Sequence, residues 1–167
     1  IDKLPLPVKS APGFLVNAVL GPYLYAAIQA VDQGLSPETV DAALLAFGMP
    51  MGPIELVDLV GLDVALAAGK SLDDAAGRAP RCLLDKVAAG HLGKKAGRGF
   101  YLYRNGRPVK NRPASVPAQL AERLLKPLLD RTRQLVDAGI VADADLADAG
   151  VIFGTGFAPF TGGPLHY

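Results

Sequence analysis

The sequence predicts an all-α protein of two helical units in tandem, with only a short strand or extended segment near residues 99–103. Apolar residues recur at helical spacing in most long segments, and prolines and glycines stand where those segments begin and end. The second half of the chain also repeats the pattern of the first half. With 167 residues, half of them hydrophobic, the chain is long enough for one good core or two small ones.

The first unit, residues 1–103, opens on an apolar segment that carries no formal charge from residue 10 to residue 31. Ser10 is a candidate cap, Pro12 suits a first turn and Gly34 is a natural stop, so we expect one helix over this span. Its apolar residues cover every face, which is typical of a helix that is buried on all sides. Pro22 lies inside the helix and predicts a kink.

Three further helices are expected in the first unit. One begins after the cap Ser36 and ends at Gly48, one covers residues 54–72, and one runs from residue 80 to about residue 90. The aromatic sequence "FYLY", residues 100–103, favours a short strand because aromatic residues pack well on a pleated surface.

Residues 104–116 are rich in proline and polar residues without apolar periodicity, so we interpret them as a linker. The second unit, residues 117–167, contains a strongly amphipathic segment over 119–140 and a shorter helical segment over 143–154. A turn-rich end follows.

The two units resemble one another in detail. Pro127 and Gly139 each stand 105 residues after their counterparts Pro22 and Gly34. Further on, "VDAALLAFGMPMGP" parallels "ADAGVIFGTGFAPFTGGP" with small insertions. These matches favour a duplicated module whose copies pack against each other, and chance similarity of two apolar helices is the alternative.

Composition excludes several classes of function. The net charge of +1 argues against a protein built for nucleic acid or anionic lipid. Cys82 is the only cysteine, so an intrachain disulfide and a cysteine-based zinc site are excluded and a reducing cytoplasm is expected. The uncharged run is long enough for a membrane helix, but its prolines, glycines and amides argue against a membrane span.

No complete active site is visible in the sequence. The strings "GRGFYL" and "GTGFAP" contain only the first two glycines of a dinucleotide fingerprint, and no Walker loop, HExxH motif or nucleophile elbow occurs. No metal site is expected. Glu55, Asp58 and Asp63 stand at helical spacing and suit either acid–base work or, as we favour, a capped and solvated helix face.

Positive charge is concentrated between residues 90 and 112, where seven cations occur without an acid: Lys94, Lys95, Arg98, Arg104, Arg107, Lys110 and Arg112. The glycines of "GKKAGRG" would let a backbone approach an anion closely. An ordinary solvated linker accounts for most of these charges, whereas for Lys94 and Lys95 contact with an anion stands as an equal alternative.

Asn17 is a single amide early in the apolar helix. Burying an amide without a partner costs roughly 1 to 3 kcal/mol. Its amide would bond either to backbone groups freed by Pro22 or to a ligand, and spacing alone favours the first.

Three strings together match one known family. "KSAPGFLVNAVLGPYL", "FGMPMGPIELVDLVGLD" and "GKKAGRGFYLY" resemble, in order and spacing, the C-terminal domain of 3-hydroxyacyl-CoA dehydrogenases. The tail from residue 139 is similar to the second copy of that domain in multifunctional fatty-acid β-oxidation α-subunits. The resemblance implies a tandem repeat of the helical module shared with the C-terminal region of 6-phosphogluconate dehydrogenase.

The resemblance also implies the chemistry. In the family an N-terminal Rossmann domain binds NAD and supplies a histidine and glutamate pair, and the helical domain closes the cleft in which a 3-hydroxyacyl-CoA is oxidised to a 3-oxoacyl-CoA. These 167 residues match only the helical part, so we expect a fragment that is inactive alone. The implied setting is cytoplasmic.

Carried over residue by residue, Asn17 matches an asparagine that positions the substrate near its reacting oxygen. Lys95 matches a lysine that reaches the cofactor, with Lys94 beside it. Phe153 stands where some members have a substrate-contacting tyrosine, so the hydroxyl contact is missing here. Ala18 replaces a common arginine, and any polar contact of that arginine is lost.

The partners that the resemblance implies are a 3-hydroxyacyl-CoA substrate, a second copy of the chain in a homodimer and a possible thiolase subunit. The competing interpretation is a non-catalytic helical interaction module with a basic docking loop. An RNA-binding protein is a third interpretation, disfavoured by the small net charge.

Overall fold

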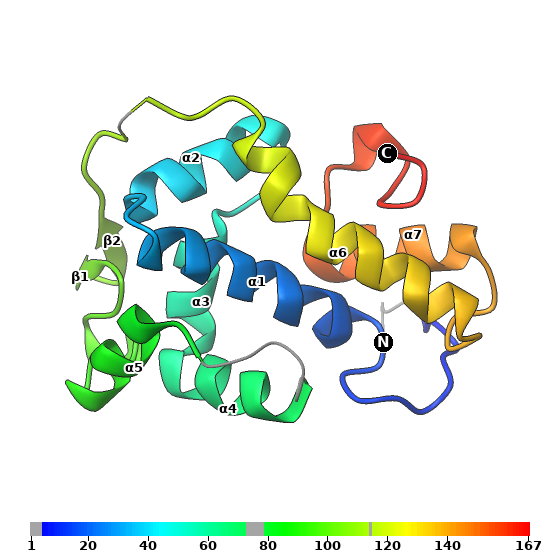
Figure 1. Cartoon of the computed structure of the whole chain (residues 1–167), viewed down its shortest axis with the longest axis horizontal. Coiled ribbons are helices and arrows are strands. Elements are labelled where there is room, and N and C mark those ends of the chain that lie inside the picture. Colours follow the sequence, from blue (N-terminus) through cyan, green and yellow to red (C-terminus); the bar gives the residue numbers. More distant parts are fainter. Residues whose placement is uncertain (1–4, 73–78, 114) are drawn as a thin grey trace.

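The computed structural model describes residues 5–72, 79–113 and 115–167, and helices dominate all three stretches (Figure 1). The predicted all-α class is confirmed. The elements in chain order are α1 (Val16–Asp32), α2 (Pro37–Phe47), α3 (Pro53–Val60), α4 (Leu62–Leu72), α5 (Arg81–Ala88), the 3₁₀ turn η1 (Lys94–Ala96), strands β1 (Leu102–Arg104) and β2 (Arg107–Val109), α6 (Leu120–Asp137), α7 (Ala144–Thr155) and the 3₁₀ turn η2 (Pro159–Thr161).

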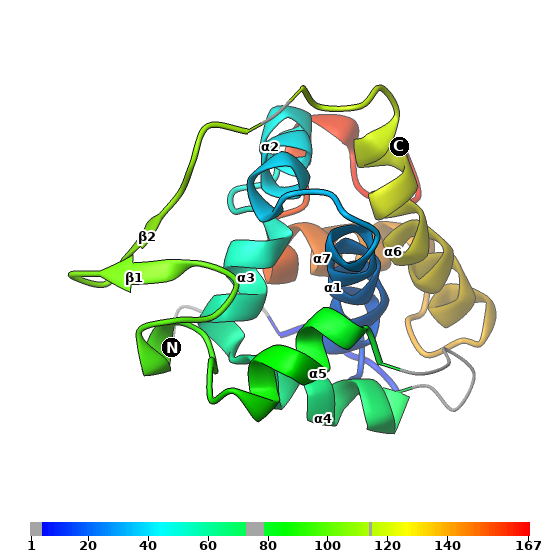
Figure 2. The same cartoon turned by 60° about the vertical axis from the view of Figure 1, so that its left-hand side comes forward.

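Helix α1 is the centre of the molecule. It packs against each of the other α-helices of the described residues, most extensively against α6, and the other helices lie around it in both views (Figures 1 and 2). This central place explains an apolar helix without charges, since nearly every face of α1 meets another helix. Among the described residues, no helix has the length and hydropathy that crossing a membrane requires.

The start of α1 differs from the prediction. The helix begins at Val16 rather than near Ser10, because Gly13 and Phe14 take left-handed backbone angles, with φ of 75° and 51°, which a right-handed helix cannot continue through. A side chain on Gly13 would also meet the backbone nitrogen of Ala18 at 2.8 Å. The Gly13–Phe14 turn therefore sets where the helix starts.

Two other elements were expected in a simpler form. Residues 54–72 make two helices rather than one, since Gly61 between α3 and α4 has a φ of 108° and a ψ of 132°. The predicted strand over 100–103 is shifted to Leu102–Arg104, because the amides of Phe100 and Tyr101 donate to the carboxylate of Asp58.

The segment 104–116, interpreted as a linker, begins with part of a hairpin. β2 pairs with β1 in antiparallel register, and Asn105 and Gly106 form the two-residue turn with φ of 51° and 75°. An Asn-Gly pair between two strands is the strongest local signal for a hairpin, and it was present in the sequence. The hairpin projects from the helices (Figure 2).

Helices α1 and α6 end in the same way. Gly34 and Gly139 both have positive φ, and the amides of Leu35 and Ile140 donate to the carbonyls of Ala30 and Leu135. Each of these positions at the end of α6 lies 105 residues after its counterpart at the end of α1. Both helices also carry an interior proline, and they are packed side by side.

Helices α2 and α7 each carry an aspartate that bonds to a Gly-Pro turn elsewhere in the chain. Asp41 in α2 accepts a hydrogen bond of 2.8 Å from the amide of Ile54, which follows the pair Gly52-Pro53. Asp148 in α7 accepts a bond of the same length from the amide of Leu165, which follows Gly163-Pro164. In each case a buried aspartate accepts a hydrogen bond from the residue that follows a Gly-Pro pair.

The two aspartates differ in their second partner. Asp41 accepts from the hydroxyl of Tyr101, whereas Asp148 is bonded to Nδ1 of His166. The hydrogen bond to Asp148, and then its charge, raise the pKa of His166, with a smaller contribution from Asp145. The turn after α7 is thus closed by a titratable contact.

We expect the His166 contact to make stability depend on pH. A histidine with a raised pKa stabilises the fold fully below its unfolded pKa, about 6.5, and this contribution is lost as pH rises through the folded value. The unfolding temperatures of the wild-type chain and of His166→Gln should therefore converge at pH values above the folded pKa of His166. They should diverge as the pH falls below it. His91→Gln is the control, and a wild-type profile parallel to that of His166→Gln would contradict the assignment.

Candidate functional site

An apolar groove of about 750 Å³ runs along α1. One wall comes from α3 and α4 and the other from α6, so residues far apart in the sequence line it together. Its lining is mainly apolar, and Asn17 and Gln29 of α1 are among its few polar members. Such a hollow with a few placed polar groups is the usual form of a small-molecule site.

Asn17 is not buried, although the sequence interpretation treated it as an amide inside an apolar helix. Its side chain is exposed and makes no hydrogen bond to another described residue. The reason lies in the turn before it: α1 starts only at Val16, so Asn17 is in the first helical turn instead of the interior. The amide is therefore not used to repair the helix at Pro22, and it is available to a ligand.

Phe153 comes from the far part of the chain to the start of α1. Its neighbour Gly154 packs so closely on Val16, the neighbour of Asn17, that a side chain on Gly154 would lie 2.4 Å from a Val16 methyl carbon. The Phe153 ring is 75% exposed. The fold thus brings two of the predicted site residues to the same end of α1.

The two lysines of "GKK" behave differently. Lys95 donates to both carboxylate oxygens of Asp63 at 2.7 Å, and this hydrogen bond lowers the pKa of Asp63. Lys94 is exposed and pairs with no carboxylate among the described residues. Contact of Lys95 with an external anion therefore competes with Asp63, whereas Lys94 is free for such a contact.

The glycines of the same loop serve the protein's own backbone. A side chain on Gly93 would lie 2.2 Å from the carbonyl oxygen of Asp58, and one on Gly99 would lie 2.1 Å from its carboxylate. They let the loop pack closely around the buried Asp58. The carboxylate of Asp58 accepts hydrogen bonds from the backbone amides of Phe100 and Tyr101, with N···O distances of 2.8 and 2.9 Å. Burial raises the pKa of Asp58, and these amides and the charge of Lys86 act against the rise.

A buried network joins the loop to α2 and α3, and sequence reasoning missed it. Asp41 accepts from the hydroxyl of Tyr101 at 2.7 Å and from Lys110 at 3.0 Å, and Lys110 also donates to Glu55 at 2.6 Å. Burial opposes the charge of Lys110, but the bonds to Glu55 and Asp41 outweigh it and raise its pKa. Lys110 stands in the predicted linker, where no periodic pattern marks a buried partner.

The three carboxylates of "IELVDLVGLD" are therefore all engaged by protein groups: Glu55 by Lys110, Asp58 by two amides and Asp63 by Lys95. Cys82 is half-buried, and burial raises the pKa of its thiol to about 12, which makes it a poor nucleophile. The described residues contain no group of three or more histidine, cysteine or carboxylate side chains suited to a metal ion. Asn17 makes no such bond, so among the site residues taken from the sequence its side chain is open to a ligand.

Comparison with known proteins agrees with this geometry. A family model described as the C-terminal domain of 3-hydroxyacyl-CoA dehydrogenase matches residues 13–103. Two curated relatives are fatty acid oxidation complex alpha subunits from Shewanella putrefaciens and another Shewanella strain, 36% and 35% identical to the chain over 99% of its length. The chain spans only 26% of the length of each.

Solved structures give the same picture. A 3-hydroxybutyryl-CoA dehydrogenase from Escherichia coli superposes with a TM-score of 0.76 over 98% of this chain and 54% of its own, at 22% identity, which shows the shared fold. An (S)-3-hydroxybutyryl-CoA dehydrogenase from Ralstonia eutropha is 39% identical over 59% of this chain and 37% of its own, with a TM-score of 0.54.

Proposed function

The chain belongs to the 3-hydroxyacyl-CoA dehydrogenase family, and from that premise we propose that it forms the substrate-cleft and dimerisation region of an NAD-dependent enzyme of fatty-acid β-oxidation. The observation that carries the proposal is the exposed, unbonded amide of Asn17 at the groove along α1. The alpha-subunit relatives match nearly the whole chain, which supports a multifunctional enzyme as its source. A cytoplasmic setting belongs to the same proposal.

Asn17 acts as the positioning group. When a hydroxyl is oxidised to a carbonyl, a neutral amide N–H can donate to the reacting oxygen and fix its direction without trapping a charge. The start of α1 holds this amide by the Gly13–Phe14 turn, so its place is set by backbone geometry and not by competing bonds. Phe153, at the same end of the helix, offers an apolar ring to the substrate where a hydroxyl contact is absent.

NAD, when bound, supplies the acceptor for the hydride. The described residues offer only peripheral contacts to this cofactor. Lys94 has a free ammonium group, and Lys95 can bind an anion only if it leaves Asp63. We assign the rest of the cofactor site to a preceding domain, as the resemblance implies. The domain bounds 1–103 and 117–167 are part of the same proposal, and the matched turns at Asp41 and Asp148 support them.

We expect the 167 residues alone to show no formation of NADH from 3-hydroxybutyryl-CoA and NAD. Neither "GRGFYL" nor "GTGFAP" lies in a βαβ unit, and the sheet of the described residues has two strands only. The control is a longer polypeptide in which an NAD-binding domain precedes residue 1, assayed under the same conditions. Turnover by the 167 residues alone would contradict the proposal.

An alternative function rests on a different observation. Five cations near the hairpin, Lys94, Arg98, Arg104, Arg107 and Arg112, are exposed and pair with no carboxylate of the described residues. A non-catalytic interaction module with a basic docking loop would use them. The longer polypeptide separates the two functions, because only the dehydrogenase form requires Asn17 for turnover. For the enzyme, a homodimer and a thiolase subunit stand as the proposed partners.

A further inference from the structure

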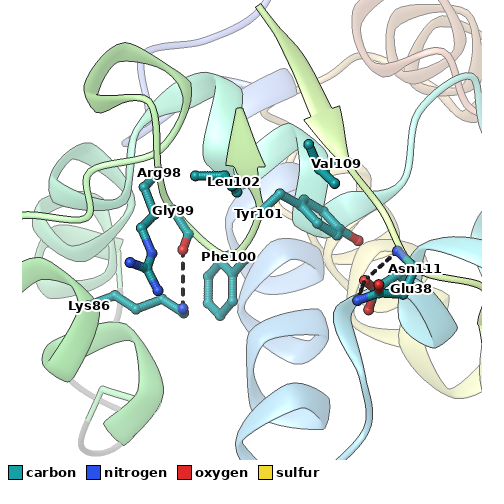
Figure 3. Close-up of a pocket in the computed structure, with 9 residues that line it drawn as sticks. All are labelled: Glu38, Lys86, Arg98, Gly99, Phe100, Tyr101, Leu102, Val109 and Asn111. Carbon is teal, nitrogen blue, oxygen red and sulfur yellow. Dashed lines mark hydrogen bonds between the residues drawn. The ribbon is translucent and has the colours of Figure 1, made fainter. Parts of the chain in front are cut away.

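A second hollow lies away from the groove, between the hairpin, α5 and the start of α2 (Figure 3). Its volume is about 400 Å³, within the range of small-ligand sites of roughly 300 to 1,000 Å³. None of its lining residues lines the groove that holds Asn17. The apolar side chains of Phe100, Leu102 and Val109 form its middle.

Two cations stand at one end of this hollow. Lys86 and Arg98 point toward one another in Figure 3, and no carboxylate pairs with either of them among the described residues. Lys86 donates one bond, of 3.1 Å, to the carbonyl of Gly99 and lies 5.0 Å from the centre of the Phe100 ring, which leaves further ammonium protons free. The exposed Arg98 guanidinium makes no hydrogen bond to a described residue. Two cations that face one hollow and form no salt bridge with a described residue favour an anion between them.

The opposite end carries acceptors. Oε1 of Glu38 accepts hydrogen bonds from the backbone amide and the side-chain amide of Asn111, at 3.0 and 3.2 Å. These two bonds fix the orientation of the carboxylate. Its second oxygen receives no hydrogen bond from a described residue. An anion is disfavoured at this end by the charge of Glu38, whereas an amino or hydroxyl group would be bound there.

We propose that this hollow binds a small phosphorylated molecule, with its phosphoryl group between Lys86 and Arg98 and an amino or hydroxyl group on Glu38. The separation of the cations from the carboxylate orients such a ligand, and the apolar middle accepts a flat or aliphatic body. This site is independent of the proposed dehydrogenase function, because it shares no residue with the Asn17 groove.

AMP is the probe for the test, since it carries both a phosphate and an exocyclic amine. We expect it to bind the chain saturably and to shift the amide NMR signals of Gly99, Phe100 and Val109. Arg98→Gln should weaken AMP binding at least about tenfold, because it removes one of the two cations from the phosphoryl end. Adenosine and inorganic phosphate, which each lack one of the two recognised groups, should both bind more weakly than AMP.

Arg112→Gln is the matched control, since Arg112 is an exposed cation of the same basic segment outside the hollow. It should leave AMP affinity unchanged, and both variants should keep the wild-type unfolding temperature. An absence of saturable shifts would overturn the proposal. Equal losses in the two variants would also overturn it, because they would show diffuse charge attraction, the behaviour expected of an RNA-binding surface.

Discussion

Gly52→Ala is expected to lower the free energy of unfolding by about 4 kcal/mol, because the added methyl group overlaps a buried, hydrogen-bonded carboxylate. The added carbon would lie 2.1 Å from Cγ of Asp41. Asp41 cannot move aside freely, because Ile54, Tyr101 and Lys110 all donate to its carboxylate. Since Gly52 has a φ of −66°, alanine suits its backbone and the effect isolates the steric contact.

Chemical denaturation measures this loss, and alanine substitutions at two other glycines serve as comparisons. Gly69→Ala, inside α4, places its carbon 3.1 Å from the Tyr25 ring and should change stability by no more than about 0.5 kcal/mol. Gly163→Ala, the counterpart in the second unit, would meet Asp148 at 2.3 Å and should be strongly destabilising as well. If Gly52→Ala matched Gly69→Ala, the aspartate turn would not constrain the fold.

Asn17→Ala should lower kcat about 100-fold in the longer, NAD-binding protein, as loss of a single positioned donor does in other enzymes. The same change should leave the unfolding free energy of the 167 residues within about 0.5 kcal/mol, because the exposed amide bonds to no described residue. Steady-state kinetics and denaturation measure the two effects separately. Asn17→Asp keeps the size but removes the donor, so it should be equally slow.

Gln29→Ala is the control for the activity measurement. Gln29 is a second exposed amide of α1 that lines the same groove, so its removal tests whether any amide of the groove matters. We expect its kcat to stay near wild type. If Asn17→Ala lost much stability but kept normal turnover, Asn17 would have a structural role. That result would remove the main support for the proposed function.

Much of the fold followed from local chemistry. Ser36 caps α2 through the amide of Thr39 at 3.1 Å, and Gly48 ends that helix with a φ of 115°, both as predicted. Gly34 and Gly139 end α1 and α6 as their spacing indicated. These features depend on residues within one helical turn of each other, so the sequence expresses them directly.

The sequence-based predictions were wrong or incomplete where a residue far away in the sequence forms a hydrogen bond with the segment in question. Phe100 and Tyr101 carry strand-forming side chains, yet Asp58, more than 40 positions away, takes their amides and moves the strand to Leu102. Lys110 stood in a segment without a pattern and became the partner of Asp41 and Glu55. Such bonds join residues that only the folded chain brings together.

By itself, the sequence determined the all-α class, the repeated helix and turn pattern and the family, because these reside in the order and spacing of residue types. It also singled out Asn17, but for a reason that the fold changed: the amide was expected inside a helix and lies exposed in its first turn. Tertiary structure decided which polar groups are occupied. Lys95, Glu55, Asp58 and Asp63 are engaged by long-range partners, whereas Asn17 and Arg98 bond to no described residue. The fold brings a partner to each of the first set, and it leaves the other two at the surface of a groove and of a hollow.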